Sequence, residues 1–242
     1  MTHQMQTQWD PSAARAAGGL YLAIAICGGF SIGYVPMQIV VAGDPAASAA
    51  NLLANQGLFR LGVLADSAVI LFELAITVIL YHLFRQTSPT MAMVALLSRA
   101  GMIVIMGVNL LFWVMSYIVL TGPEAFSSDQ PHILAQFCFD AHAMGVFVWQ
   151  LFFGAHLLAL GWLVCKSDAV PNFLGWGLFV GAFGYLIQGL VELTFTDIAL
   201  LDQIIIALLV VVTLSEVSFG LWLLFRGGAP TRKSENQMAA AA

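Results

Sequence analysis

Four ionisable side chains lie near the middle of long apolar segments of this chain: Glu73, Arg99, His156 and Glu216. A charge at the centre of a bilayer costs about 3 kcal/mol on insertion scales, so each must face a partner or a water-filled cavity. Counted at about 1.5 Å per residue from the expected helix ends, all four lie roughly 13–17 Å deep. The hydrocarbon core is about 30 Å thick. The sequence therefore predicts a shared polar layer, used either for ion pairing or as a substrate or proton site.

Arg99 is the residue around which this layer is expected to form. A guanidinium stays protonated in proteins, so it needs an anion or several hydrogen-bond acceptors. Glu73 and Glu216 are available at matching depth on two other helices. We predict a buried ion pair between Arg99 and a carboxylate, with the second Glu protonated or also bound to Arg99. Two interpretations stay open, a structural pin and a functional site, and His156 is left outside the pair.

A second polar group is expected nearer the outer face of the membrane. Asp66 and Glu73 are seven residues apart, so they share one helix face and could line a polar track toward the layer. The group is interpreted either as hydrogen bonding between helices or as a ligand-entry vestibule. Its members are Asp66, Asp140, His142, Gln188 and Glu192, with Arg60 as a further candidate at the same side.

Histidine spacing raises the question of a haem. His142 and His156 are fourteen residues apart, a spacing that places two haem ligands on one helix face in some membrane cytochromes. Each haem would need a second axial ligand, and His82 at the end of its span is the one other histidine in the membrane region. Haem is therefore not expected. Zinc and di-iron sites are not expected either, so no cofactor is predicted. No catalytic motif is present, so catalytic residues stay unknown.

Composition sets the class of protein. The chain has 242 residues, of which 60% are hydrophobic and 9% charged. Soluble domains carry about 25% charged residues, so a polytopic membrane protein is indicated. Without a basic patch, nucleic-acid binding is not expected. The lipid bilayer is the expected partner, with a lipid or small amphipathic molecule as a candidate ligand, and the oligomeric state is open.

Hydropathy predicts an all-α bundle of about six transmembrane helices in one domain, residues 17–226. A segment near 45–56, opened by Asp44 and Pro45, is too short and polar to span and is expected at the outer interface. Residues 1–16 are expected to be a cytoplasmic segment and 227–242 a disordered cytoplasmic tail. The spans are expected near 17–38, 58–84, 90–120, 132–165, 171–195 and 201–226.

Charge distribution predicts the orientation. Basic residues gather on one side of this threading: Arg15, Arg85, Lys166, Arg226, Arg232 and Lys233. Acidic residues hold the other side, where Arg60 is the one base: Asp44, Glu124, Asp129, Asp197 and Asp202. The positive-inside rule then places both termini in the cytoplasm.

Short motifs give the chain a family resemblance from about Ala13 to Gly228. In chain order they are Phe59-Arg60-Leu61-Gly62, Asp66, Arg99, Lys166-Ser167, Pro171, Leu174-Gly175, Glu216, Leu221-Trp222-Leu223-Leu224 and Arg226-Gly227. This order resembles a bacterial membrane-protein family known as domain of unknown function 4386. Asn172 departs from the pattern, since similar proteins often carry a basic residue there. The resemblance implies a multi-pass membrane protein and adds that Arg60, Asp66, Arg99 and Glu216 recur, without implying an activity.

Three classes of function remain open from the sequence. A small transporter or channel-like protein predicts a wet track through Asp66, Glu73 and Arg99. An intramembrane enzyme acting on a lipid, isoprenoid or quinone predicts a lateral cavity where Arg99 and acids converge on a head group. A structural or accessory protein predicts a dry, fully paired layer. A pocket that reaches Glu73, Arg99 and Glu216 would distinguish the last class from the other two.

Overall fold

Helices make up the regular structure of the protein. The computed structural model describes residues 9–122, 130–195 and 198–227, and no strand occurs in these ranges. Six helical stretches are long and apolar enough to cross a membrane, which confirms the all-α class and the predicted number of spans. They are Pro11–Ile39, Gln56–Phe84, Pro89–Thr121, Pro131–Lys166, Asn172–Leu193 and Ala199–Arg226. The predicted tail lies outside the described residues, apart from Gly227.

The first stretch is one continuous run of three pieces, α1 (Pro11–Gly28), the π-helical η1 (Gly29–Tyr34) and α2 (Val35–Ile39). Pro36 explains the widened turns, because a proline lacks an N–H and its ring clashes with the preceding turn of an α-helix. The other elements are α3 (Pro45–Ala54), α4 (Gln56–Phe84), α5 (Pro89–Thr121), α6 (Pro131–Lys166), α7 (Asn172–Leu193) and α8 (Ala199–Arg226). α1 begins six residues before the predicted start at 17.

Side-chain caps set three helix starts, each with a proline at the first helical position. Asp10 accepts a hydrogen bond from Ser12 N at 2.8 Å, Asp44 from Ala47 N at 2.9 Å, and Ser88 from Met91 N at 3.4 Å. A capping oxygen satisfies one of the free N–H groups of the first turn, and proline loses no bond there. These caps and prolines therefore determine where α1, α3 and α5 begin.

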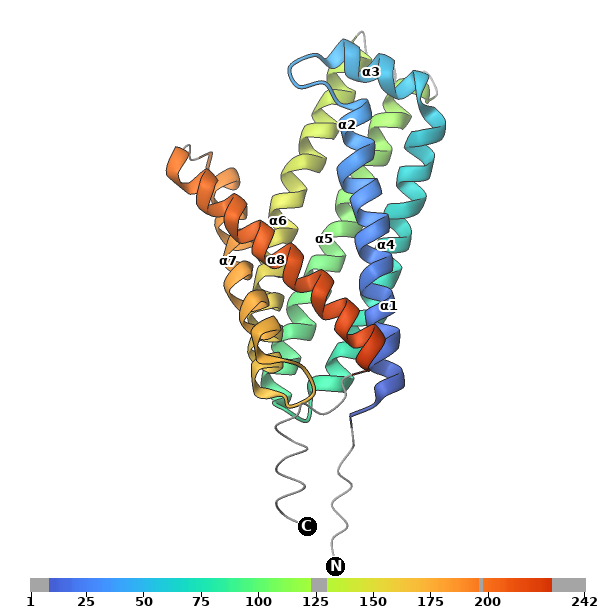
Figure 1. Cartoon of the computed structure of the whole chain (residues 1–242). Helices are drawn as coiled ribbons and strands as arrows, with labels where there is room; N and C mark the ends of the chain where they lie inside the picture. Colours follow the sequence, from blue (N-terminus) through green and yellow to red (C-terminus); the bar gives the residue numbers. More distant parts are fainter. Residues whose placement is uncertain (1–8, 123–129, 196–197, 228–242) are drawn as a thin grey trace, which may run out of the picture.

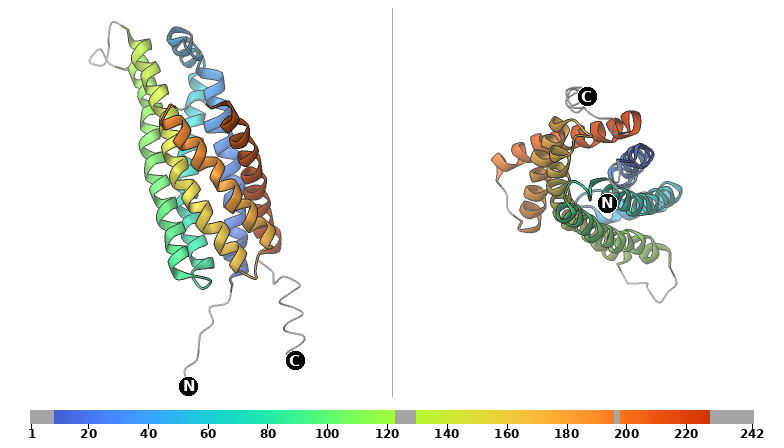
Figure 2. Two further views of the ribbon diagram at one scale, coloured as in Figure 1. Left: turned by 90° about the vertical axis from the view of Figure 1, so that its left-hand side faces the viewer. Right: turned by 90° about the horizontal axis from the view of Figure 1, so that it is seen from below.

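The six long helices form a ring in which each contacts the next, in the order α1, α4, α5, α6, α7, α8 and back to α1 (Figures 1 and 2). The indole Nε1 of Trp9 donates to Gly227 O at 2.8 Å, so both ends of the described chain meet at one end of the bundle, here called the terminal end. α3 caps the opposite end, here called the α3 end (Figure 1).

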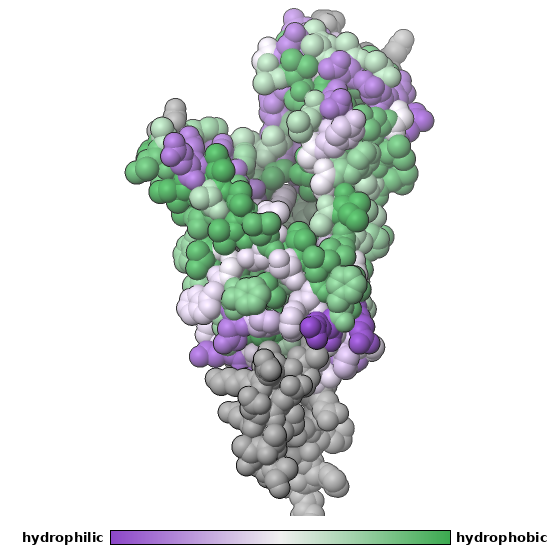
Figure 3. All heavy atoms as spheres, viewed as in Figure 1, coloured by the Kyte–Doolittle hydropathy of each residue, from purple (hydrophilic) through white to green (hydrophobic). Residues whose placement is uncertain are grey.

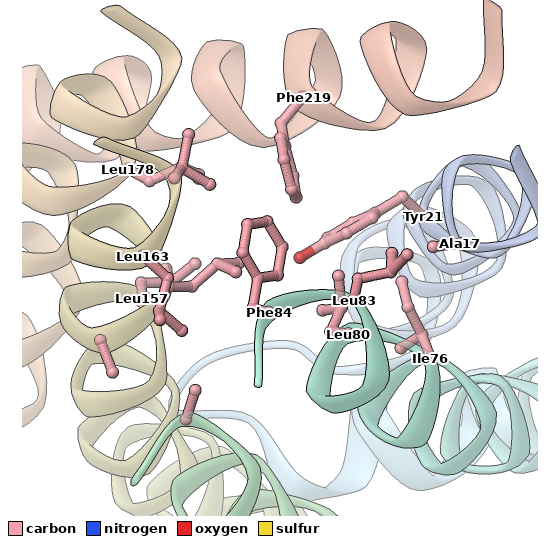
Figure 4. Packing of buried hydrophobic residues seen from close by; sticks show 14 of the residues in the cluster. Ala17, Tyr21, Ile76, Leu80, Leu83, Phe84, Leu157, Leu163, Leu178 and Phe219 are labelled. Atoms are coloured by element: carbon pink, nitrogen blue, oxygen red, sulfur yellow. The ribbon is translucent and has the colours of Figure 1, made fainter. Parts of the chain in front are cut away.

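The ring closes tightly at the terminal end. A β-carbon on Gly18 of α1 would overlap the backbone of α8 at Gly220 and Leu224, so glycine is what permits this approach. Aromatic and aliphatic side chains from α1, α4, α6, α7 and α8 fill the interior there, and the rings of Tyr21 and Phe219 meet edge to face at 5.5 Å (Figure 4). The larger hydrophobic cluster includes this packing, and a smaller one, with Val35, Leu52 and Trp113, lies toward the α3 end.

Toward the α3 end, α7 and α8 lean away from α1 and α4 (Figure 1). Figure 3 shows the surface hollowed between the two parts, with apolar residues around the hollow and hydrophilic residues at the two ends. α8 has 28 residues, a length of about 42 Å, which exceeds the hydrocarbon core and fits a tilted crossing. The tilt of α8 opens the ring on one side.

Candidate functional site

Arg99 on α5 is the most enclosed charged side chain of the described residues, with 0% of its surface exposed. Its Nε donates to Oε2 of Glu73 on α4 at 2.6 Å, and this is the one ion pair that the described part of the chain contains. Glu73 is itself 4% exposed. A buried charge needs a partner at close range, and Glu73 supplies it. The predicted pairing of Arg99 with a carboxylate is therefore present, with Glu73 as the carboxylate.

His156 on α6 also binds Arg99, although the sequence prediction left it outside the pair. Its Nδ1 lies 2.8 Å from Ala95 O, and its Nε2 lies 2.8 Å from Nη1 of Arg99. A carbonyl only accepts and a guanidinium only donates, so Nδ1 carries the proton and Nε2 accepts. The imidazole is therefore neutral, and both nitrogens are occupied by protein groups, which leaves neither for a metal ion.

Aromatic groups complete the surroundings of Arg99. Nη1 also donates to the hydroxyl of Tyr21 on α1 at 3.2 Å. The guanidinium carbon lies 5.3 Å from the Tyr21 ring centre and 5.5 Å from that of Phe153 on α6, distances at which a cation is attracted to a ring face. We name Tyr21, Glu73, Arg99, Phe153 and His156 the Arg99 cluster. It joins α1, α4, α5 and α6.

Glu216 stands apart from this cluster, on α8. No Lys, Arg or His nitrogen of the described residues lies within 4.0 Å of its carboxylate. Glu216 and Tyr185 on α7 face the same space between the helices. The alternative in which Arg99 binds both glutamates therefore does not occur: Arg99 binds Glu73, while Glu216 and Tyr185 lie on the α7–α8 side.

A cavity of about 370 Å³ separates the two sides and is lined by residues of all six ring helices. Its polar groups are those of Glu73, Arg99, Glu216, the two tyrosines and Thr213. The remaining wall is apolar or aromatic: Leu22, Ile24, Ala25, Gly28, Gly29, Ile32, Val69, Met102, Met106, Trp149, Phe153 and Val217. Arg99 and both glutamates of the predicted layer thus line one cavity, whereas His156 does not.

Asp66 on α4 lies in a second, much smaller space nearer the α3 end. It is 8% exposed, and its carboxylate accepts from the Ser31 hydroxyl at 3.5 Å. The space has room for about one water molecule, at about 10 Å³, and it shares Ile32, Met106 and Trp149 with the large cavity. Asn109 and His142 also line it, and His142 Nδ1 lies 3.1 Å from Asn109 O. Asp66 and Glu73 therefore border adjoining spaces.

The other candidates are not brought to either space. Arg60 is exposed and donates to the Tyr117 hydroxyl at 2.9 Å, and Asp140 is exposed and accepts from Gln136 at 2.8 Å. Gln188 accepts from Gln150 at 3.2 Å, and Glu192 is exposed. Among the described residues, no group of three or more His, Cys, Asp or Glu could hold a metal ion.

Comparison with known proteins places the chain in a family. The family described as "Domain of unknown function (DUF4386)" matches residues 16–227. The chain belongs to this family. It is also 36% identical over 77 residues to an uncharacterised protein of the archaeon Archaeoglobus fulgidus. That match covers 32% of this chain and 43% of the relative, so the chain spans less than half of that protein. No solved structure matches the chain significantly.

Several residues that carry the DUF4386 resemblance have clear structural tasks. A β-carbon on Gly62 would lie 3.0 Å from Val35, and one on Gly175 would lie 2.8 Å from the backbone of Gly161, so both positions need close helix contact. Gly227 ends α8 with φ of +58°, a conformation that favours glycine. Arg99 and Glu216 differ from these, since they face the cavity.

Four aromatic residues of the cavity wall were not among the predicted site residues of this DUF4386 protein: Tyr21, Trp149, Phe153 and Tyr185. The ring centres of Phe153 and Tyr185 are 5.3 Å apart and those of Trp149 and Tyr185 are 6.5 Å apart, so they form a continuous aromatic surface. From the sequence alone, an aromatic residue deep in an apolar span that contacts a ligand looks the same as one that packs against other helices.

Proposed function

We propose that this DUF4386 protein binds a small amphipathic molecule in the cavity between the Arg99 cluster and Glu216. The volume of about 370 Å³ falls in the range of pockets that hold small organic ligands. The wall is mostly apolar, and its few polar groups can orient one polar end of a ligand. The observation that carries the proposal is this cavity, lined by acidic and hydroxyl groups, in the middle of a membrane bundle.

The ligand would enter sideways from the bilayer, between α1 and α8. Ala25 and Gly29 on one side of the cavity and Thr213 and Val217 on the other are exposed at its edge. The outer surface beside this edge is apolar: Ile26 is 73% exposed. An apolar rim in a membrane protein faces hydrocarbon, so an acyl or prenyl tail could pass through it while the head group stays inside.

A purely structural role accounts for only part of this arrangement. The Arg99 cluster joins four helices through bonds within the protein, as a structural pin would. It accounts neither for the empty space beside it nor for the carboxylate of Glu216 on the opposite wall. Transport or catalysis would each begin with the proposed binding step.

We also propose that the protein resides in the cytoplasmic membrane of a bacterium with both termini inside. Four basic residues lie at the terminal end of the bundle: Arg15 near the start of α1, and Arg85, Lys166 and Arg226 at the ends of α4, α6 and α8. Asp44 lies at the α3 end, just before α3. Such a bias places the basic end in the cytoplasm. In a cysteine-free background, an impermeant maleimide should label Ala46→Cys but not Gln86→Cys in intact cells, and the reverse labelling would contradict this orientation.

The binding proposal can be tested with bromodecanol, whose bromine quenches tryptophan fluorescence, added to the protein in phosphatidylcholine nanodiscs. We expect saturable quenching that depends on Trp149, because this residue lines the cavity. Ala25→Phe should abolish the saturable part by filling the mouth. Ile26→Phe makes the same kind of change on the lipid-facing side of the same helix and should leave it intact. Quenching that never saturates, or that ignores Ala25→Phe, would refute the proposal.

A further inference from the structure

The cavity wall holds more acidic than basic side chains. These are two carboxylates, Glu73 and Glu216, and one guanidinium, that of Arg99. Glu73 and Arg99 neutralise one another at 2.6 Å. His156 adds no charge, because its hydrogen bonds fix it as a neutral imidazole. One carboxylate therefore faces the cavity without a cation of its own among the described residues.

Arg99 is poorly placed to bind an anionic head group. Its Nε and Nη1 are taken by three protein acceptors, and the face of its guanidinium is covered by the rings of Tyr21 and Phe153. The side chain is 1% exposed. A phosphate or carboxylate that approached Arg99 from the cavity would meet the carboxylates of Glu73 and Glu216 on the same wall. The chemistry of the wall thus opposes an anion.

The surroundings of Glu216 suit a cation. Glu216 is half-buried and lines the cavity together with Tyr185. Trp149 and Tyr185 present aromatic rings on the same space, and ring faces attract ammonium groups. A charge inside the membrane needs a counter-charge, and a bound cation would supply it.

We infer that the ligand of this cavity carries a cationic alkylammonium head, which pairs with Glu216 between the Tyr185 hydroxyl and the aromatic wall while its apolar tail leaves between α1 and α8. This inference rests on the proposed function and specifies the class of ligand. The ammonium group would bind by its N–H donors and its charge. The protein would therefore discriminate among amphipathic molecules by the charge of their heads.

The test compares three probes with one bromodecyl tail and different heads: ammonium, hydroxyl and sulfate. Each is titrated into wild-type protein and into Glu216→Gln in phosphatidylcholine nanodiscs at fixed ionic strength, with quenching of Trp149 as the readout. The ratio of Kd values between the two proteins removes differences in partitioning of the probes into lipid. Asp202→Asn removes a carboxylate from the same helix outside the cavity and serves as the matched control.

We expect Glu216→Gln to weaken the ammonium probe about tenfold or more, the loss of one charge-assisted contact, and to change the hydroxyl probe less than about twofold. Glu216→Asp should restore part of the preference, and Asp202→Asn should change neither probe. An equal loss for both probes, or preferred binding of the sulfate probe, would overturn the inference while the proposed function stands. Absence of saturable quenching by every probe in the wild-type protein would overturn both.

Discussion

Glu73 and Glu216 face one cavity from opposite sides, yet their surroundings differ in kind. Glu73 is 4% exposed and pairs with Arg99, which also binds His156 and Tyr21. Glu216 sits on the α7–α8 side with a tyrosine hydroxyl and no cation within 4.0 Å among the described residues. The same side chain thus serves as an internal counter-ion at one position and is available to a ligand at the other. Stability should depend on the first, and recognition on the second.

The largest effect on stability is expected for Glu73→Gln. This change leaves the guanidinium of Arg99 buried without an anion, and breaking one partner of a buried ion pair costs about 3–5 kcal/mol. Equilibrium unfolding in mixed micelles would measure the change in the free energy of unfolding. A loss under about 1 kcal/mol would show that the cavity or lipid supplies another partner for Arg99.

A double variant distinguishes the contribution of the ion pair to stability from the contribution of the volume that its side chains fill. Arg99→Met with Glu73→Leu removes both charges and keeps apolar volume, and such replacements of buried pairs are often neutral or stabilising. We expect the double variant to recover most of the stability that Glu73→Gln loses. If it unfolds as readily as the single variant, the cluster contributes more than mutual neutralisation.

An intermediate effect is expected for His156→Phe. The ring is replaced by one of similar shape, but Arg99 loses an acceptor at 2.8 Å. An unsatisfied buried donor costs about 1–3 kcal/mol. The same unfolding assay measures it, with Phe137→Leu on the exposed side of α6 as a control that should change little. Wild-type stability of His156→Phe would mean that this hydrogen bond is replaceable.

The smallest effect is expected for Glu216→Gln. Since this carboxylate has no paired cation, its removal leaves no orphaned charge, and the cost should stay below about 1 kcal/mol. Unfolding of this variant beside Glu73→Gln is the direct comparison of the two positions. A loss of stability as large as that of Glu73→Gln would contradict the assignment of Glu73 as counter-ion and Glu216 as ligand group.

The membrane helices could be predicted from the sequence because the length of an apolar segment and the prolines at its boundaries are local features of the chain. Depth could also be counted along a helix, and this identified Glu73 as an available partner of Arg99. The capped start of α1 was missed, since residues 11–16 are small or polar. Counted from the predicted start at residue 17, Tyr21 would lie about 6 Å deep in the membrane. Counted from the observed start at Pro11, it lies about 15 Å deep, level with Arg99.

The remaining features depend on how the helices are rotated and tilted. His156 meets Arg99 only because α6 packs against α5 with this face, and a distance of 57 residues in sequence gives no hint of it. Likewise, depth alone made Glu216 a partner of Arg99, but the tilt of α8 sets it across a cavity. Contacts between helices are properties of three-dimensional packing that one sequence does not encode in a readable pattern.

The contact between α1 and α8 has a consequence for the order of biosynthesis. Of the described membrane helices, α1 leaves the ribosome before the others and α8 after them, and they touch where Gly18 meets Gly220 and Leu224. The five earlier helices can complete the Arg99 cluster while translation continues, because domains assemble from the N-terminal side during synthesis. Glu216 arrives with α8, after the helices of the Arg99 cluster, so we expect that cluster to form before the cavity is complete.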